Sequence, residues 1–383
     1  MPEVAPVVSK RRAALKKLSV PFVDLGARHA PLRARLLEAV GRVLDHGQFI
    51  LGPEVAELEE RWARRCGVRH AIGVSSGTAA LSLILKALDI GAGDEVVTAP
   101  NSFIASASSV VLAGATPRFA DVGDDFNMDP ESVQACIREN TRAIVVVHLT
   151  GRPAAMDEIN AIANRRQVVV IEDAAQAMGA KSAGRPVGSL GLAGAFSLHP
   201  LKIIGGCGDA GMITTDDDAL ADQLRRLRNH GFQNRQEDCT AWGYNERMDT
   251  LQAALALVKW DHLDTWIQRR RDQAAIYRRR LVKFVRIPPD RPNDQAVYQT
   301  FPVLADRRDS LADFLRHHDI GCAVHYPVPI HLLEAARELG YRRGDLPEAE
   351  KQATRTLSLP IHEGLTDEQI HHVCDVIERF YDE

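Results

Sequence analysis

The chain contains 383 residues, of which 45% are hydrophobic and 26% are charged, and its formal net charge is −4 at pH 7. This composition is ordinary for a globular protein, and the length suits one large domain with a smaller one. The slight negative charge gives no electrostatic case for binding nucleic acid or an anionic membrane, and no apolar run approaches the roughly 20 residues that a membrane-spanning helix requires.

The six cysteines lie far apart in the sequence, with no C-x-x-C pair. Scattered cysteines favour free thiols in a reducing compartment over disulfides or a zinc site. We therefore expect a cytoplasmic protein without a metal centre. The amino end, residues 1–20, is basic but lacks the apolar core of a signal peptide, so we interpret it as a solvated tail rather than a targeting segment.

The first predicted helix runs from residue 32 to about 44, and a second begins at Pro53 and closes at Gly67. From about residue 70, short apolar runs typical of buried strands alternate with segments of helical spacing. The predicted strands are 70–75, 94–98, 116–120, 142–147 and 167–172, and the helices between them are 78–88, 103–113, 129–139 and 156–165. This alternation predicts an α/β fold with a mostly parallel central sheet and helices on both faces.

The carboxyl-terminal part has a different pattern. A helix is predicted at 217–229, then a polar loop at 230–246 and one long helix at 249–282, whose basic triplet Arg269–Arg271 we interpret as a solvated face. The predicted elements after it are strands at 297–304 and 321–326 and helices at 309–318, 347–356 and 366–381. This order indicates a smaller α+β domain. We expect a tail at 1–20, a large domain at 21–260 and a small C-terminal domain at 261–383.

The segment Ser75-Ser-Gly-Thr78 follows a predicted strand and precedes a predicted helix. Its backbone N–H groups and hydroxyls would then lie at a helix N-terminus, whose partial positive charge suits a phosphate dianion. An ordinary helix N-cap is the competing interpretation, because Ser and Thr are common at that position.

Asp173 ends the apolar run Val168-Val-Val-Ile-Glu-Asp173. A carboxylate at this point can keep a pyridine nitrogen protonated, and a protonated ring withdraws electrons from a developing carbanion. Glu172 should face the opposite side, because side chains alternate along a strand. A helix cap on the following Ala-Ala-Gln is the alternative role for Asp173.

Lys202 lies between the apolar runs 194–198 and 212–215, just before a glycine-rich stretch that lets the backbone turn tightly. A solvated surface lysine is the ordinary interpretation of a single Lys. Here, however, an amine, a carboxylate and an anion-binding turn all fall at strand ends, where parallel sheets bind ligands. These are the three parts that hold pyridoxal phosphate. Lys202 would form an imine with the cofactor aldehyde and then shuttle a proton.

These motifs belong to a longer set that resembles the DegT/DnrJ/EryC1/StrS family of pyridoxal-phosphate-dependent sugar aminotransferases, which have the type I aminotransferase fold. The resemblance covers nearly everything after residue 20. The matching segments are Pro21-Phe-Val-Asp-Leu25, Phe49-Ile-Leu-Gly-Pro-Glu-Val55, Ser76-Gly-Thr78-Ala-Ala-Leu81, Pro100-Asn-Ser-Phe-Ile-Ala-Ser106, Glu172-Asp-Ala-Ala-Gln176, Ser197-Leu-His-Pro-Leu-Lys202, Gly243-Tyr-Asn-Glu-Arg-Met248 and His325-Tyr-Pro327.

The resemblance implies roles around the cofactor. Lys202 would be the lysine that carries it, Asp173 the partner of the pyridine nitrogen, and Gln176 the donor to the ring hydroxyl. Phe103 would stack on the face of the ring. The residues that would hold the phosphate are Ser76, Gly77, Thr78 and Ser197.

The resemblance also implies residues beyond the ring. Asn245 would reach the phosphate of the other subunit's cofactor, which implies a homodimer with shared active sites. The residues that would line the sugar pocket are Arg247, His325 and Tyr326. Two further residues of the motif region are interpreted as structural rather than functional. We expect His199 to be packed and hydrogen-bonded, and Cys207 to be a small buried residue.

The function implied is transamination, in which L-glutamate converts the cofactor to pyridoxamine phosphate and the amine then passes to the keto group of a nucleotide-linked sugar. Family dehydratases replace the lysine by histidine, so the presence of Lys202 disfavours that reaction. Two alternatives stay open. One is an aminotransferase acting on a keto-cyclitol, as in aminoglycoside pathways, and the other is a regulatory or sensing protein that keeps the fold without turnover.

Overall fold

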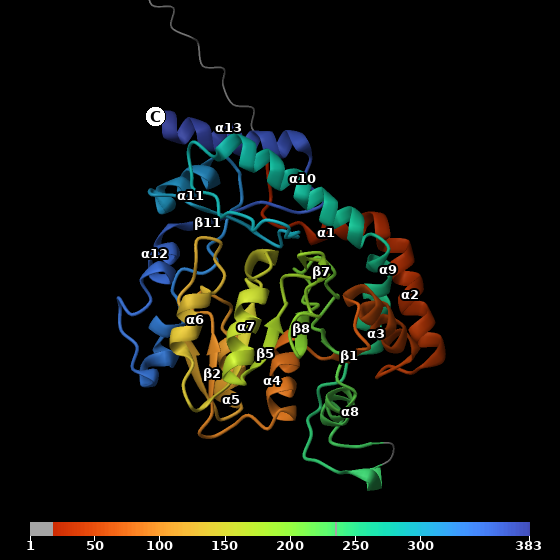
Figure 1. The fold of residues 1–383 in the computed structure, drawn as a ribbon. Helices are drawn as coiled ribbons and strands as arrows, with labels where there is room; N and C mark the ends of the chain where they lie inside the picture. The colour runs from red at the N-terminus through yellow and green to blue at the C-terminus, as the bar shows by residue number, and fades with distance from the viewer. Residues whose placement is uncertain (1–17, 234–235) are drawn as a thin grey trace, which may run out of the picture.

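The computed structural model describes residues 18–233 and 236–383, and a seven-stranded sheet lies at its centre (Figure 1). The sheet order is β1-β9-β8-β5-β4-β2-β3, and β9 alone runs antiparallel to its neighbours β1 and β8. The strands are β1 (His70–Val74), β2 (Glu95–Thr98), β3 (Thr116–Phe119), β4 (Thr141–Val147), β5 (Val169–Asp173), β8 (Ala193–Ser197) and β9 (Gly211–Thr215). The predicted α/β fold with a mostly parallel sheet is thus confirmed.

Both faces of the sheet are covered because its strands are apolar on both sides. In β4, Ile144 and Val146 belong to the core on one face, whereas Ala143 and Val145 belong to the core on the other. The first core is completed by α3 (Pro53–Cys66), α6 (Pro130–Cys136), α7 (Met156–Arg166) and α9 (Thr250–Trp260). The second is completed by α4 (Gly77–Ala87), α5 (Ala105–Leu112) and α8 (Asp218–Leu227).

The amino-terminal elements are short until α2 (Arg33–His46), which packs its apolar stripe on α9. They are α1 (Leu25–His29) and η1 (Ala30–Leu32). A small hairpin, β6 (Lys181–Ser182) with β7 (Arg185–Pro186), leaves the main sheet between β5 and β8. The single turns η2 (Leu149–Gly151) and η3 (Gln236–Asp238) follow β4 and α8.

A separate apolar core gathers most of the carboxyl-terminal elements, of which α10 (Leu263–Leu281), α11 (Arg308–His317) and α13 (Asp367–Asp382) lie above the sheet in Figure 1. The largest is α10, against which α13 packs. The rest of this core comes from β10 (Phe301–Leu304), α11 and β11 (Thr356–Leu359). Three further elements pack instead in a small cluster with residues of α5 and β3, and they are η4 (Ile330–Leu332), η5 (Glu334–Leu339) and α12 (Pro347–Arg355). Val20 also joins this core: it is fully buried, and its N–H donates to the carbonyl of Asp319.

Two predictions about this part were wrong. The long helix expected at 249–282 is two helices, α9 and α10, which part at Asp261 and His262, so that α9 packs on α2 and α3 while α10 packs on α13. The strand expected at 321–326 is reduced to one bridge between Ala323 and Ser358. The actual partner of β10 is β11, a strand that was not predicted and that begins where the predicted helix 347–356 ends.

The interpretation of the triplet Arg269–Arg271 as a solvated face was wrong for Arg270, whose exposed fraction is only 2%. The interpretation of residues 1–20 as a solvated tail lies largely outside the described residues, which begin at residue 18. Within the described ranges no helix is long and apolar enough to cross a membrane. In the same ranges no group of His, Cys, Asp and Glu side chains has the arrangement of a metal site. All six cysteines are described, and none forms a disulfide.

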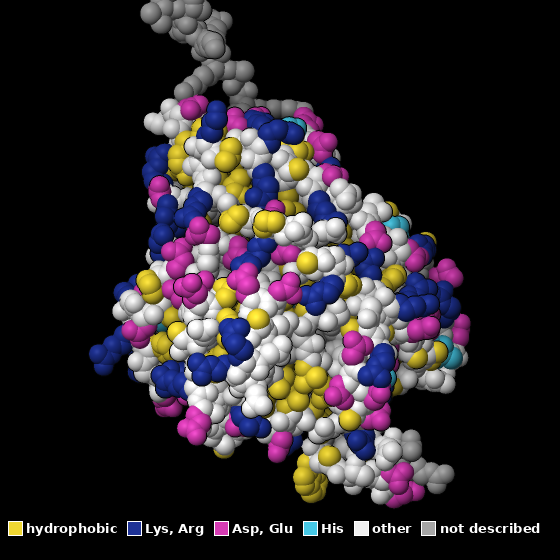
Figure 2. Space-filling view, in the orientation of Figure 1, with side chains coloured by type: hydrophobic (Ala, Val, Ile, Leu, Met, Phe, Trp, Pro, Cys, Tyr) yellow, Lys and Arg dark blue, Asp and Glu magenta, His cyan; other side chains and the backbone are white. Residues whose placement is uncertain are grey.

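Lysine and arginine side chains are interspersed with aspartate and glutamate over the face drawn in Figure 2. Elsewhere, ion pairs form between neighbouring turns of single helices, such as Arg42 with Glu38 and Arg61 with Glu57. Exposed pairs of this kind contribute little to stability but keep the surface electrically mixed. This face therefore presents no surface of one sign to a charged polymer.

Candidate active site

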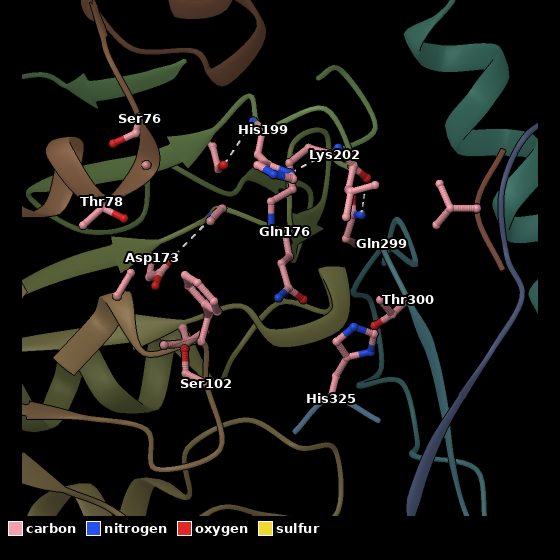
Figure 3. A pocket seen from close by; sticks show the side chains of 18 of the residues that line it. Ser76, Thr78, Ser102, Asp173, Gln176, His199, Lys202, Gln299, Thr300 and His325 are labelled. Atoms are coloured by element: carbon pink, nitrogen blue, oxygen red, sulfur yellow. Dashed lines mark hydrogen bonds between the residues drawn. The ribbon is translucent and has the colours of Figure 1, made fainter. Parts of the chain in front are cut away.

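A cavity of about 460 Å³ opens where the carboxyl ends of the parallel strands meet the carboxyl-terminal unit. Ten residues singled out from the sequence line it: Ser76, Gly77, Thr78, Phe103, Asp173, Gln176, Ser197, Lys202, His325 and Tyr326. In Figure 3, Asp173, Gln176 and Lys202 point into a common space. Ser76 and Thr78 lie at one side of this space, and Thr300 and His325 lie at the other. The chain thus brings together an amine, a carboxylate and a helix N-terminus.

The turn after β1 places the N-terminus of α4 at the cavity. Ser76 caps the helix, because its Oγ accepts the N–H of Ala79 at 3.0 Å, so the N-cap interpretation holds for this side chain. Gly77 is packed against β8, where an added Cβ would lie 2.9 Å from the Cβ of Ser197. The remaining N–H groups of this first turn, together with the hydroxyls of Thr78 and Ser197, border the cavity.

Asp173 is the last residue of β5 and is 7% exposed. Its Oδ1 accepts the N–H of Ala175 at 3.2 Å within a turn, and no helix follows in the described residues 174–180, so the helix-cap alternative was wrong. Burial raises the pKa of this carboxyl, and the Ala175 N–H and the charge of Lys202 offset the rise in part. A cationic group placed next to Asp173 in the cavity would therefore be stabilised by it.

Glu172 faces the opposite side, as strand alternation predicts, and is fully buried. The Nδ1 of His148 accepts the N–H of Ala154 at 3.0 Å, so its Nε2 carries the proton and donates to Glu172 at 3.0 Å. The Glu172 carboxylate also accepts three backbone N–H groups, those of Gly188, Leu190 and Gly191. This carboxylate anchors β5 to the segment before β8 and does not enter the cavity.

Lys202 lies in an irregular turn after β8 rather than in a strand or helix. Burial lowers the pKa of its amine to about 8, and the charge of Asp173 partly opposes that shift. An appreciable fraction of the amine is therefore unprotonated near neutral pH, which an amine needs before it can attack a carbonyl carbon.

Aromatic and amide side chains form the wall between Asp173 and the outer part of the cavity. The Oε1 of Gln176 accepts the N–H of Thr150 at 2.7 Å, so the orientation of this amide is fixed. The rings of Phe103 and Tyr326 lie 6.2 Å apart. Burial raises the pKa of Tyr326 to about 12, with the charge of Asp173 adding to the effect, so Tyr326 keeps its proton. The Nδ1 of His325 lies 3.0 Å from the hydroxyl of Ser358, and burial lowers its pKa.

Asn245 and Arg247 are not among the residues that line this cavity. Asn245 is exposed and forms a bridge with Asn229, whose Oδ1 accepts a hydrogen bond from Nη1 of Arg247 at 3.1 Å. Arg247 lies against the end of β1, where it forms a bridge with Val74. Within one chain, neither side chain reaches the cavity.

The structural interpretations of His199 and Cys207 as buried residues were wrong. His199 is exposed and borders the cavity instead of being packed in the core, although its Nδ1 does accept the N–H of Leu201 at 3.3 Å. Cys207 is exposed rather than buried, because the glycine-rich segment that carries it lies on the surface. Its Sγ is 3.8 Å from Nζ of Lys259.

Other residues at the cavity escaped the sequence analysis. Arg28 and Arg270 are both buried, and both pair with Glu363, Arg270 at 3.2 Å. Gln299 and Thr300 come from the segment before β10. The only signal in the sequence was that Arg270 occupies the inward-facing position of a basic helical triplet, since the partners of these residues are distant in the chain.

A cavity at the strand ends of an α/β fold, with a half-buried lysine, a buried carboxylate and a helix N-terminus, is that of a pyridoxal-phosphate-dependent enzyme. The chain belongs to the DegT/DnrJ/EryC1/StrS aminotransferase family, whose model matches residues 31–378. It is an aminotransferase, as the resemblance implied.

Two relatives match over nearly their whole length. A pleiotropic regulatory protein of Geobacillus stearothermophilus is 42% identical, over 95% of this chain and 99% of its own. The dTDP-3-amino-3,4,6-trideoxy-alpha-D-glucose transaminase of Streptomyces venezuelae is 40% identical, over 94% of this chain and 96% of its own.

Solved structures agree with these matches. S. venezuelae DesV, in complex with a ketimine intermediate, has a TM-score of 0.93 at 40% identity and covers 95% of this chain and 99% of its own. The ntda protein of Bacillus subtilis, with bound cofactor PMP, has a TM-score of 0.89 at 29% identity, over 98% of this chain and 87% of its own. The cofactor of the present protein is pyridoxal phosphate, with pyridoxamine phosphate as its intermediate form.

The cavity suits this cofactor. Its phosphate needs a helix N-terminus that the backbone can approach closely, and Gly77 has no room for a side chain there. Its aldehyde needs an amine that is readily deprotonated, and the pKa of Lys202 is lowered to about 8. Its ring nitrogen needs a carboxylate partner, and Asp173 offers a carboxylate that is buried away from water.

Proposed function

We propose that this protein is a sugar aminotransferase that moves the amino group of L-glutamate to the keto group of a nucleotide-linked sugar. The observation that carries the proposal is the single cavity in which Lys202, Asp173 and the N-terminus of α4 converge. The choice of substrate is supported by two relatives about 40% identical, one named as a transaminase of a dTDP-linked sugar and the other as an aminotransferase of a UDP-linked sugar.

The proposed roles follow the chemistry of each group. Bound pyridoxal phosphate supplies an electron-withdrawing ring and a carrier for the amino group. Lys202 holds the cofactor and then moves the proton, Asp173 keeps the ring nitrogen protonated, and Gln176 donates to the ring hydroxyl. Phe103 packs on the ring face. The residues proposed to hold the phosphate are Ser76, Gly77, Thr78 and Ser197.

We further propose that the outer cavity receives the sugar against His325 and Tyr326. Arg247 would act there only from a second subunit, because it does not line the cavity of its own chain. Tyr326 retains its proton and can donate to a sugar oxygen. His325 is held neutral by its lowered pKa, so it can accept a hydrogen bond from a hydroxyl.

A homodimer with shared sites is part of the proposal. Its support is that Asn245 is exposed and lies close in sequence to Trp242, which is 92% exposed, and to the exposed Tyr244. Large exposed aromatic side chains of this kind are typical of interfaces. If Asn245 serves the partner's cavity, mixing Lys202→Ala and Asn245→Ala subunits rebuilds one intact site in each mixed dimer. The mixture should then show about a quarter of wild-type activity, and no recovery would contradict shared sites.

We also propose the division into a large unit at 21–260 and a small unit at 261–383, which the separate core of the carboxyl-terminal elements supports. Val20 lies in that core and would belong to the small unit rather than to a tail. A cytoplasmic location stays a proposal, supported by the six free thiols.

One observation favours a second candidate function. The relative that is 42% identical bears the name of a pleiotropic regulatory protein, which fits a sensing role on the same fold. A keto-cyclitol is the alternative acceptor, and its hydroxylated ring would meet the same side chains.

One experiment separates these candidates. Protein loaded with pyridoxamine phosphate is incubated with a panel of nucleotide-linked keto-sugars and keto-inositols, and the aminated products are identified by mass spectrometry. We expect amination of a nucleotide-linked keto-sugar, with glutamate restoring the pyridoxamine form. Amination of keto-inositols alone would favour the cyclitol reaction. A protein that binds the cofactor but aminates nothing in the panel and does not react with glutamate would favour the sensor.

A further inference from the structure

Gln299 lies at the bend before β10, and its side-chain amide contacts the turn that carries Lys202. Its Nε2 donates to the carbonyl of Leu201 at 2.8 Å, and its Oε1 accepts the N–H of Ile203 at 3.2 Å. These two residues flank Lys202, so one amide group fixes the backbone on both sides of the lysine. Figure 3 shows Gln299 beside this turn, on the side away from Asp173.

Besides this amide, the turn is held near the lysine by its own backbone and by Arg28, and further along by Lys259, which donates to the carbonyls of Gly205 and Gly206. Its own backbone bonds join the N–H of Lys202 to the carbonyl of His199 at 2.8 Å and the N–H of Gly205 to the carbonyl of Lys202 at 3.1 Å. An irregular turn of this kind can shift its backbone more easily than a strand can. Any such shift moves the amine, and small displacements of a reacting group lower its reactivity steeply.

Gln299 is itself held by the carboxyl-terminal unit. Nη1 of Arg270 donates to the carbonyls of Tyr298 at 3.1 Å and Gln299 at 3.3 Å. The same guanidinium pairs with Glu363, which also pairs with Arg28. Nη1 of Arg28 then donates to the carbonyl of Lys202 at 2.9 Å. The contacts form a closed chain that begins and ends at the lysine turn.

From this geometry we propose that Gln299 is a positioning residue, which holds the turn so that the amine of Lys202 is aimed at the cofactor, and that it couples the carboxyl-terminal unit to the lysine. The inference rests on the role proposed for Lys202 above. Gln299 acts through the backbone at Leu201 and Ile203 rather than on the reacting atoms.

The test compares three variants. Gln299→Leu removes both bonds at similar volume, and Gln299→Glu keeps the acceptor for Ile203 while losing the donor to Leu201. Gln352→Leu is the control: Gln352 is more deeply buried than the half-buried Gln299, and its Nε2 likewise donates to a backbone carbonyl, that of Gly123 at 2.8 Å, but it does not line the cavity. Each cofactor-free protein is mixed with pyridoxal phosphate at several pH values, reduced with borohydride at timed intervals, and mapped by peptide mass spectrometry.

We expect Gln299→Leu to slow labelling of Lys202 by about tenfold and to shift the pH midpoint of the labelling rate. For both quantities, Gln299→Glu should lie between the wild-type protein and Gln299→Leu. Gln352→Leu should lower the melting temperature without moving either quantity. A wild-type rate and midpoint in Gln299→Leu would overturn the inference, as would equal slowing in Gln352→Leu. Should Gln299→Leu fail to fold, Gln299→Glu decides by the same criterion. Absence of labelling at Lys202 in the wild-type protein would instead overturn the proposed function.

Discussion

The Nε2 of His148 donates to the carboxylate of Glu172 at 3.0 Å, directly behind the strand end that presents Asp173 to the cavity. Both groups are fully buried. Each oxygen of Glu172 accepts two hydrogen bonds, so the charge is balanced by four donors rather than by a cation. The position of Asp173 thus depends on a carboxylate that never meets the cofactor.

Glu172→Gln should therefore be costly, although the two side chains have nearly the same shape. Either orientation of the amide places its NH₂ group against two N–H donors. We expect a loss of about 2–4 kcal/mol in the free energy of unfolding, measured by denaturant titration. Glu60→Gln is the control, because Glu60 is exposed and its pairing with Arg64 is long, at 3.6 Å. A change in Glu172→Gln as small as in that control would contradict this view of β5.

Gly77→Ala tests the close packing of the α4 N-terminus. The new Cβ would meet Ser197 at 2.9 Å, so the helix start must move away from β8. We expect the dissociation constant of pyridoxal phosphate, measured by equilibrium dialysis, to rise by roughly tenfold or more, as displaced N–H groups bind phosphate less well.

Gly41→Ala provides the contrasting case in a helix. A Cβ at Gly41 in α2 would meet nothing within 4 Å. This variant should gain about 0.5–1 kcal/mol of stability and leave cofactor affinity unchanged. Unchanged cofactor affinity in Gly77→Ala as well would contradict the phosphate assignment.

The amine of Lys202 should react with a pH dependence of its own. Because burial lowers its pKa to about 8, modification of Lys202 in cofactor-free protein should rise through about pH 8, well below the range of an exposed lysine. Asp173 raises the pKa of the amine, so Asp173→Asn should shift the midpoint of modification to lower pH. Reductive methylation at a series of pH values, read by peptide mass spectrometry, measures both. A midpoint near that of surface lysines would contradict the buried amine.

Asp173→Asn also tests the role of Asp173 as the partner of the pyridine nitrogen of the cofactor. Asparagine keeps the acceptor for the N–H of Ala175 but cannot stabilise a protonated ring nitrogen. We expect folding to be retained while the half-reaction with glutamate slows by several powers of ten, followed by stopped-flow absorbance. A half-reaction at the wild-type rate would show that the charge of Asp173 has no part in the chemistry.

The sequence predicted the sheet and most of the cavity because those signals are local. Lys202 and Asp173 each follow a short apolar strand, and the pattern of one strand is enough to place its end. The missed features depend on contacts between distant segments. Arg28 and Glu363 meet across almost the whole chain. Likewise, β11 was not predicted, because its pairing with β10 defines it.

The central claim is that the buried amine of Lys202 holds the cofactor, and Lys259 offers an internal comparison. Lys259 is also buried and also has a lowered pKa, but its Nζ donates to the carbonyls of Gly205 and Gly206. The most direct measurement is peptide mapping of the wild-type protein after incubation with pyridoxal phosphate and reduction with borohydride. We predict a single labelled site at Lys202; label on Lys259 or another lysine, with Lys202 unmodified, would contradict the account.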